Sequence, residues 1–104
     1  MIGSVRVFVY YRGTDGDAVR AAYREASAAL RGVPGLISHE LLESAQDPTA
    51  FVVASSWTDF EAFGAWERGN DHRAATAPLR KFRDGRLEVP FAVYRVDRPD
   101  GGGY

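Results

Sequence analysis

The stretch FVVASSWTDFEAF, residues 51–63, contains the two signals on which the fold prediction rests. Its first seven residues are β-prone and end at Trp57, which predicts a strand. Thr58 then opens Thr-Asp-Phe-Glu, a capping-box pattern that marks the start of a helix. Aromatic side chains follow at helical spacing on one face, namely Phe60, Phe63 and Trp66. A strand is therefore expected to pass directly into a helix with an aromatic stripe.

The residues before this stretch predict a strand, a helix and a second strand. Alternating apolar residues predict a strand over 5–11, and apolar residues at helical spacing predict a helix from Thr14, as N-cap, to about Arg31. The segment 32–35 contains glycines and a proline, which end the helix. A strand over 36–44 then forms a hairpin with the strand before Trp57, through a turn at 47–49.

The residues after this stretch predict a further helical segment and a last strand. Gly69-Asn70 interrupts the first helix, and 71–82 continues as a helical segment that Pro78 breaks or loosens. A turn at 83–86 precedes a strand over 91–96.

The order of elements is therefore strand, helix, strand, strand, helix, strand. This order is typical of the ferredoxin-like split-βαβ class of α+β folds, with a four-stranded antiparallel sheet and helices on one face. The other face of the sheet is left bare. Its apolar residues, either Val5, Val7 and Val9 or Phe51 and Val53, favour a homodimer through that face. Residues 1–97 are expected to form this single domain, and residues 98–104 a flexible tail.

Composition narrows the function classes. At 104 residues the chain has room for one core, and 13 basic against 14 acidic residues give a net charge of −1. No global field therefore favours nucleic acid or an anionic membrane. The absence of cysteine excludes thiolate chemistry, and two histidines without ligand spacing predict no metal site. The start of the chain has no basic region followed by an apolar run, so a cytoplasmic protein is expected.

Several segments together resemble the antibiotic biosynthesis monooxygenase family. They are Val33-Pro34-Gly35-Leu36-Ile37, the stretch from Phe51 to Phe63, Trp66, and Asn70-Asp71-His72-Arg73. The resemblance covers most of the chain. It implies a dimeric α+β barrel, in which each subunit keeps a pocket between its own sheet and helices. Members include cofactor-independent oxygenases that turn polyketide anthrones into quinones, haem-degrading enzymes and quinol oxygenases.

The family's site residues carry over only in part. The tryptophan of the haem-degrading branch matches Trp66, but its histidine falls on Thr76, and the first strand here has no asparagine. In the anthrone oxygenases a tryptophan of the third strand matches Trp57, whereas a helical tyrosine falls on Phe63. The resemblance therefore implies a similar pocket with altered polar groups.

The residues able to carry chemistry form a short set. A phenol or quinol that has lost its proton can reduce O₂ by itself, so the protein needs an apolar chamber and a base. The catalytic candidates are His72, His39 and Trp66, and each imidazole is alternatively a merely hydrogen-bonded or solvated group. The substrate-binding candidates are Trp57, Phe63, Phe60, Tyr10, Tyr11 and Arg80. For the aromatic residues the alternative is plain core, and for Arg80 a solvated helix face.

The leading hypothesis is a cofactor-independent monooxygenase that oxidises an aromatic polyketide-type phenol, anthrone or quinol with O₂. One alternative is a polyketide cyclase or isomerase on the same barrel, in which a histidine moves protons without O₂. Another is a non-enzymatic protein that binds haem or a small ligand beside Trp66. The predicted partners are a small aromatic molecule, O₂ and a second copy of the chain, with no bound cofactor.

Overall fold

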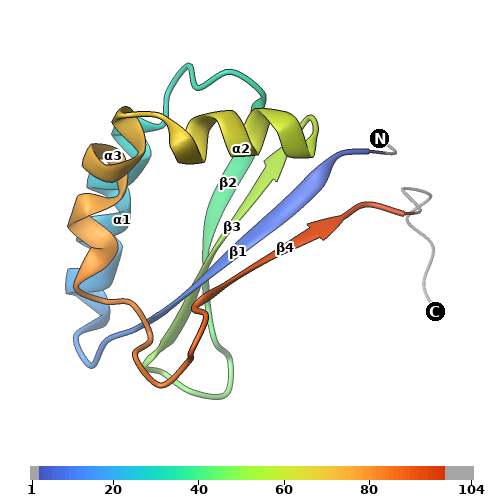
Figure 1. Cartoon of the computed structure of the whole chain (residues 1–104). Helices are drawn as coiled ribbons and strands as arrows, with labels where there is room; N and C mark the ends of the chain where they lie inside the picture. The colour runs from blue at the N-terminus through green and yellow to red at the C-terminus, as the bar shows by residue number, and fades with distance from the viewer. Residues whose placement is uncertain (1–2, 98–104) are drawn as a thin grey trace.

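The computed structural model describes residues 3–97, so the tail expected over 98–104 lies outside the described residues. Seven elements follow one another in the order expected (Figure 1). They are β1 (Val5–Arg12), α1 (Gly16–Ala29), β2 (Leu36–Glu43), β3 (Ala50–Trp57), α2 (Phe60–Arg68), α3 (Asp71–Arg80) and β4 (Phe91–Arg95). The predicted order is confirmed, with the second helical region divided into α2 and α3.

The four strands form one antiparallel sheet in the order β2-β3-β1-β4. In β1, Val5 lies opposite Trp57 of β3, and Tyr11 lies opposite Phe51. All three helices lie on the same side of this sheet in Figure 1. The α+β, ferredoxin-like fold class is therefore confirmed.

The two faces of the sheet differ from the expectation in one respect. Val5, Val7 and Phe51 are buried under the helices. Because side chains alternate along a strand, the uncovered face carries the intervening residues instead. Its apolar members are Phe8, Tyr10, Leu42, Val52 and Tyr94. The uncovered face carries apolar residues as expected, together with Arg6, Arg12 and Glu40, but its apolar residues are those of the opposite alternation.

Both helix starts lie one residue later than the sequence patterns suggest. The N-cap of α1 is Asp15, whose carboxylate accepts a hydrogen bond from the Ala18 amide at 3.2 Å, rather than Thr14. The N-cap of α2 is Asp59, which accepts from the Ala62 amide at 2.7 Å. In each case an aspartate follows a threonine, and its carboxylate both caps a free amide and suits the positive end of the helix.

Pro78 does not break α3, which continues to Arg80. The proline lies near the end of the helix, where its missing amide removes only the hydrogen bond to the Ala74 carbonyl. The predicted interruption at Gly69-Asn70 is confirmed, because Gly69 closes α2 in an extended conformation. This joint sets α2 across one end of the sheet, while α3 lies beside α1 (Figure 1).

Gly35 holds the start of α2 against the loop before β2. Its φ of +83° lies in the region that favours glycine, and a Cβ there would collide with the side chain of Ala62. Its carbonyl also accepts a hydrogen bond from the Thr58 amide at 2.8 Å. The aromatic residues of α2 are thereby placed over the sheet.

Candidate functional site

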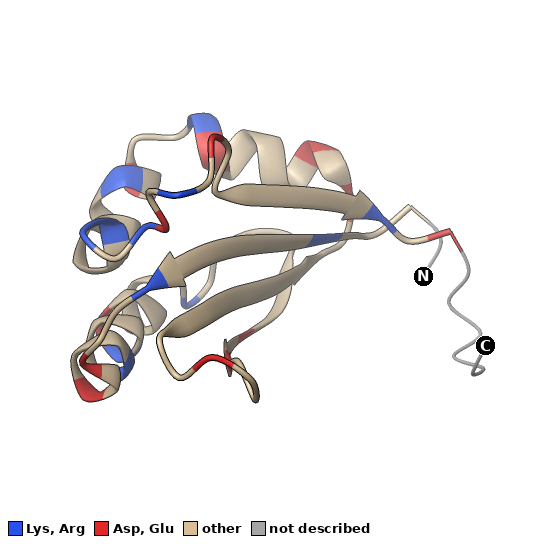
Figure 2. Ribbon diagram, turned by 90° about the horizontal axis from the view of Figure 1, so that it is seen from below, with Lys and Arg blue, Asp and Glu red and all other residues tan. Residues whose placement is uncertain are grey.

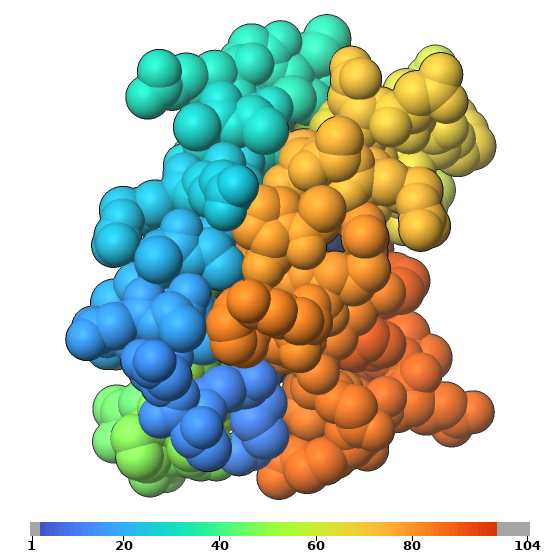
Figure 3. Space-filling model, turned by 90° about the vertical axis from the view of Figure 1, so that its left-hand side faces the viewer, coloured from blue at the N-terminus to red at the C-terminus, as the bar shows by residue number. Residues whose placement is uncertain are grey.

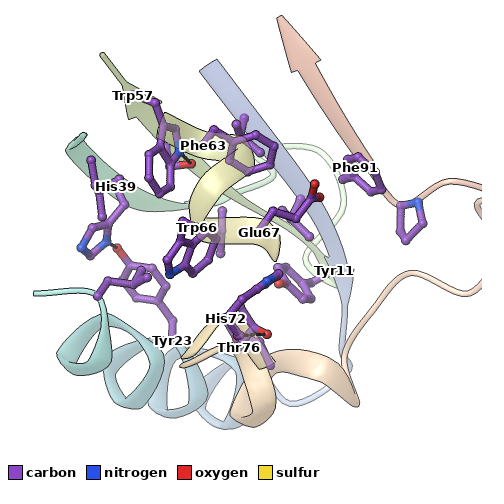
Figure 4. Close-up of a pocket in the computed structure, with 18 of the residues that line it drawn as sticks. Tyr11, Tyr23, His39, Trp57, Phe63, Trp66, Glu67, His72, Thr76 and Phe91 are labelled. Carbon is purple, nitrogen blue, oxygen red and sulfur yellow. Dashed lines mark hydrogen bonds between the residues drawn. The ribbon is translucent and has the colours of Figure 1, made fainter. Parts of the chain in front are cut away.

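A pocket of about 170 Å³ lies between the helices and the sheet (Figure 4). Every strand contributes to its floor, and every helix contributes to its walls. It is lined by Val7, Val9, Tyr11, Tyr23, Leu30, Leu36, His39, Val53, Ser55, Trp57, Phe63, Trp66, Glu67, His72, Thr76, Leu79, Arg83, Pro90 and Phe91. The chamber predicted beside Trp66 is therefore present.

Simple periodicity places these side chains in the pocket. The floor takes alternate residues of each strand, as with Val7 and Val9 on β1. On α3, His72, Thr76 and Leu79 follow a spacing of four and three residues, which keeps them on one face of the helix. Most of the pocket is thus built from strands and helices, and only Leu30, Arg83 and Pro90 of its lining lie in connecting segments.

Three aromatic rings form one wall. Trp57 is only 1% exposed, and its indole N–H donates a hydrogen bond to the Ser55 hydroxyl at 3.0 Å. Phe63 meets Trp57 edge to face with ring centroids 5.5 Å apart, and Trp66 lies 5.4 Å from Trp57. Such contacts hold the rings in place and leave an apolar surface toward the cavity. This wall suits the flat face of an aromatic ligand.

His72 lines the pocket beside Trp66. Its imidazole stacks on the Trp66 indole with a centroid distance of 4.4 Å and an interplanar angle of 25° (Figure 4). Its Nε2 atom is buried and has no hydrogen-bond partner within residues 3–97. Burial lowers the pKa of His72 below its usual 6.5, with further lowering by arginines, while Glu67 opposes the shift. At neutral pH the ring is therefore a neutral proton acceptor.

His39 lies toward the β2 edge of the pocket and is already engaged. A 2.7 Å hydrogen bond joins its Nδ1 to the hydroxyl of Tyr23, and the two rings meet edge to face (Figure 4). Burial raises the pKa of Tyr23, with Glu40 adding to the rise and a Ser27 hydrogen bond opposing it. This phenol stays protonated near neutral pH, so one ring nitrogen of His39 is committed to a neutral partner.

The exposed lining residues, Glu67, Arg83 and Phe91, mark the mouth of the pocket. Figure 3 shows a hollow between α3 and the β4 segment, with the dark blue of β1 at its floor. The opposite edge, at His39 and Tyr23, is more covered. A ligand therefore has a direct route of entry along the β4 side.

Six of the residues proposed from the sequence line the pocket together: His72, His39, Trp66, Trp57, Phe63 and Tyr11. Three do not. Tyr10 lies on the uncovered face, because neighbouring residues of a strand point to opposite sides. Phe60 is 50% exposed at the start of α2 and contacts Phe63 and Arg95 instead. Arg80 is exposed and donates to the Arg73 carbonyl at 2.8 Å.

Some pocket residues have no place in the sequence-based prediction. Glu67 follows Trp66 and lies four residues after Phe63, so helical spacing alone would have indicated it. Ser55 lies two residues before Trp57 on the same strand face. Phe91 reaches the pocket because β4 pairs with β1 in a register that brings it opposite Val9. That register is a long-range property with no local sequence signal.

Residues 4–78 match the family model of antibiotic biosynthesis monooxygenases, and this match covers well over half of the chain. The chain belongs to the antibiotic biosynthesis monooxygenase family. The resemblance inferred from the sequence is therefore confirmed. Two curated relatives come from streptomycetes. Protein SchA of Streptomyces halstedii is 29% identical over 101 residues, which are 95% of this chain and 27% of SchA.

The second curated relative is the 42.8 kDa protein in the whiE locus of Streptomyces coelicolor. It is 28% identical over 81 residues, which cover 78% of this chain and 20% of the relative. The chain thus spans about a quarter or less of the length of these two relatives.

Solved structures of the same fold include SnoaB, a cofactor-independent oxygenase from Streptomyces nogalater. The two structures superpose with a TM-score of 0.75 at 15% identity, over 95% of this chain and 97% of SnoaB. At this identity the likeness concerns the arrangement of the strands and helices. Within residues 3–97, none of the helices combines the length and apolar character needed to span a bilayer.

Proposed function

We propose that this chain is a cofactor-independent monooxygenase that oxidises an aromatic phenol, anthrone or quinol with O₂. The observation that carries the proposal is His72, which lines an apolar pocket walled by aromatic rings and whose Nε2 atom is buried without a hydrogen-bond partner among residues 3–97. A basic group in an apolar chamber is the arrangement that an enzyme needs to ionise a phenol and to keep the anion away from water.

The reaction begins with proton transfer from the substrate hydroxyl to Nε2 of His72. The resulting anion passes one electron to O₂, and the radical pair combines to form a carbon–oxygen bond. The imidazolium returns its proton to the peroxide as it forms. Loss of water then breaks the O–O bond and removes the remaining hydrogen at that carbon, which becomes a carbonyl. One oxygen atom enters the quinone and the other leaves as water, so the balance requires no external reductant.

The aromatic wall supplies binding and orientation. Trp66 is held against Trp57 on one side and His72 on the other, so a substrate ring that contacts Trp66 lies near the base. Phe63 extends the same surface, without a hydroxyl to share the proton transfer. In this proposal the acid–base work is concentrated on His72, and the other rings fix the plane of the substrate.

The size of the pocket favours small substrates. Its volume is about 170 Å³, and a protein cavity of about 150 Å³ holds a benzene molecule. One aromatic ring fits inside, and a second ring extends toward the mouth at Phe91. A three-ring anthrone requires displacement of a wall residue, and Trp66, which also lines a second, more open groove beside Gly69, would have to leave its contacts with Trp57 and His72 to make that room.

We also propose that two copies of the chain pair through the uncovered face of the sheet. Tyr94 is 59% exposed there and Leu42 is 40% exposed, while Phe8 packs edge to face on Tyr94 at 5.8 Å. An apolar sheet surface of this kind is costly in water and suits an identical surface on a second copy.

The Tyr23–His39 pair favours a second candidate function, that of a polyketide cyclase or isomerase. A hydrogen-bonded phenol and imidazole at one edge of the pocket are able to move a proton on a bound substrate, with His72 at the centre as a second base. Such an enzyme consumes no O₂, which separates it from the oxygenase.

An oxygen electrode tests the proposal. Purified protein in excess chelator receives 1-naphthol or anthrone, and O₂ uptake is compared with quinone formation by absorbance. The expected result is uptake of one O₂ per quinone at a rate above the spontaneous oxidation, with loss of that excess in His72→Phe. Turnover of the same substrates under argon would support the cyclase or isomerase and refute the oxygenase.

A further inference from the structure

Arg83 stands at the mouth of the pocket with an uncommitted charge. It follows α3, and its backbone forms an isolated bridge with Tyr11 of β1, so its position is fixed by the end of the sheet. The residue lines the pocket and is exposed. Across residues 3–97, no carboxylate forms an ion pair with its guanidinium, and no side-chain hydrogen bond involves it.

Arg12 and Arg86, unlike Arg83, form ion pairs with aspartates. Asp84 is buried, and its carboxylate binds Arg86 at 3.1 Å and approaches Arg12 at 3.6 Å. Asp84, the acid next to Arg83 in the chain, is thus paired with Arg86 and Arg12 instead. Arg12 is committed further to Asp47 at 2.9 Å. The ion pairs at this end of the sheet join Arg12, Asp47, Asp84 and Arg86 and do not include Arg83, which lines the cavity.

The mouth has a local positive character despite the chain's net charge. Figure 2 shows basic positions, with acidic ones among them, on α3 and on the segment that leads to β4. Arg73 and Arg80 of α3 are exposed and act, together with Arg83, on the pKa of His72 in the pocket. Among residues 3–97 neither of the two forms an ion pair with a carboxylate. Arg83 and Arg80 act on the pKa of Tyr11, opposing the rise that burial causes. Glu67 is the one acidic residue that lines the described pocket, and it forms no ion pair with Arg83 within 4.0 Å.

We propose that Arg83 is a specificity residue that binds a carboxylate on the substrate, so that the pocket takes hydroxylated aromatic carboxylates. The ring occupies the chamber beside Trp66 and His72, and the carboxylate stays at the mouth, where it keeps contact with water and with the guanidinium. The planar fork of arginine matches a carboxylate with two parallel hydrogen bonds. The Tyr11 hydroxyl, on the residue bridged to Arg83, is a further donor within the same pocket.

This arrangement also explains how an anionic molecule enters an apolar site. A charge at the bottom of the chamber would lose its hydration without compensation, whereas a charge at the exposed Arg83 loses little. The inference rests on the proposed use of this pocket for an aromatic substrate. Its test is therefore a binding measurement under argon, which is independent of whether the bound ligand is oxidised.

The two probes are 2-naphthol and 6-hydroxy-2-naphthoic acid, which share one ring system and differ by a carboxylate. Titration at pH 7 uses quenching of the ligand's own fluorescence. The carboxylate form is expected to bind about tenfold tighter to the wild-type protein, as one charge-assisted contact provides. In Arg83→Gln this advantage disappears, while the affinity for 2-naphthol changes by less than about twofold. Arg83→Lys keeps part of the advantage, since it retains the charge without the fork.

Two further variants separate a specific contact from the general field. Arg24→Gln removes an equal charge on the exposed side of α1, outside the pocket, and is expected to leave both affinities unchanged. Glu67→Gln removes the opposing charge at the mouth and is expected to strengthen binding of the carboxylate alone.

Equal affinities of the two probes for the wild-type protein would overturn the inference. So would equal weakening of both probes in Arg83→Gln, or the same loss in Arg24→Gln. Binding that follows the expected pattern without O₂ uptake would leave Arg83 as a carboxylate-binding residue and refute only the oxygenase.

Discussion

Replacement of His72 by phenylalanine is expected to stabilise the fold and to abolish the chemistry. The Nε2 atom of His72 is buried without a hydrogen-bond partner among the described residues, which is costly for any polar atom. Phenylalanine keeps a flat ring against Trp66, where the imidazole now stacks at 4.4 Å. It removes the unsatisfied nitrogen and, with it, the proposed base that accepts the proton of the substrate.

The size of the gain follows from this single atom. An unsatisfied buried donor or acceptor costs about 1–3 kcal/mol. The rest of the His72 ring is partly exposed, so the lower end applies, and His72→Phe is expected to gain about 1 kcal/mol of unfolding free energy. For a domain of this size such a gain raises Tm by about 4–8 °C.

The assay is urea unfolding at pH 7.5, followed by tryptophan fluorescence and circular dichroism. His39→Phe is the matched control, since it makes the same change at the other histidine of the pocket. There the 2.7 Å hydrogen bond with Tyr23 is lost, so the unfolding free energy is expected to fall by about 1 kcal/mol. The two identical substitutions thus have opposite expected signs.

A loss of stability in His72→Phe similar to that in His39→Phe would refute the reasoning. It would mean that Nε2 has a partner in solution and that His72 is an ordinary structural histidine. Retention of quinone formation by a stable His72→Phe protein would refute its role as the base.

Three other outcomes follow from the same geometry. Because burial lowers the pKa of folded His72 below the unfolded value near 6.5, the unfolded chain takes up the proton first. In urea titrations at different pH, the stability from this group is therefore fully present above that value and is lost as pH drops below it, and His72→Phe removes this dependence. Trp66→Ala is expected to weaken 2-naphthol binding by about threefold to tenfold, as loss of one aromatic contact predicts. Unchanged 2-naphthol affinity in a folded Trp66→Ala protein, measured by titration, would make Trp66 a core residue only. Tyr94→Lys is expected to convert a dimer into a monomer by light scattering with unchanged 2-naphthol affinity, whereas a monomeric wild-type protein would contradict pairing through the sheet.

The order of elements was predictable because each element has a local signal. The alternation of Val5, Val7 and Val9 indicates a strand, and the caps before α1 and α2 mark the helix starts to within one residue. The difference of one residue has a physical reason, since Asp59 competes with Thr58 for the N-cap position and its carboxylate is the better acceptor.

The faces of the sheet were less accessible to sequence analysis. Both alternations of β1 are apolar, with valines on one side and Phe8 and Tyr10 on the other, so neither is marked as the covered one. The choice is made by the partners, because Trp57 lies opposite Val5 and packs beneath α2. The position of Tyr10 outside the pocket follows from that choice.

Phe63 and Trp66 were predictable from helical spacing, and Trp57 and His72 from the family resemblance, whereas the mouth was not. Arg83 and Phe91 meet there because the segment after α3 returns β4 to the edge of β1. The sequence around each of these two residues contains no local signal for that strand pairing. The partnership of Tyr23 with His39 is also a contact between separate elements, and only the fold brings them within 2.7 Å.

Incorporation of isotope from ¹⁸O₂ is the most direct measurement of the proposed chemistry. The chelated protein is incubated with anthrone or 1-naphthol under ¹⁸O₂, and the quinone is analysed by mass spectrometry after subtraction of the spontaneous product. A monooxygenase that relies on His72 and a substrate anion places one labelled atom in each enzymatic quinone and the other in water. An enzymatic product that contains no label would contradict it.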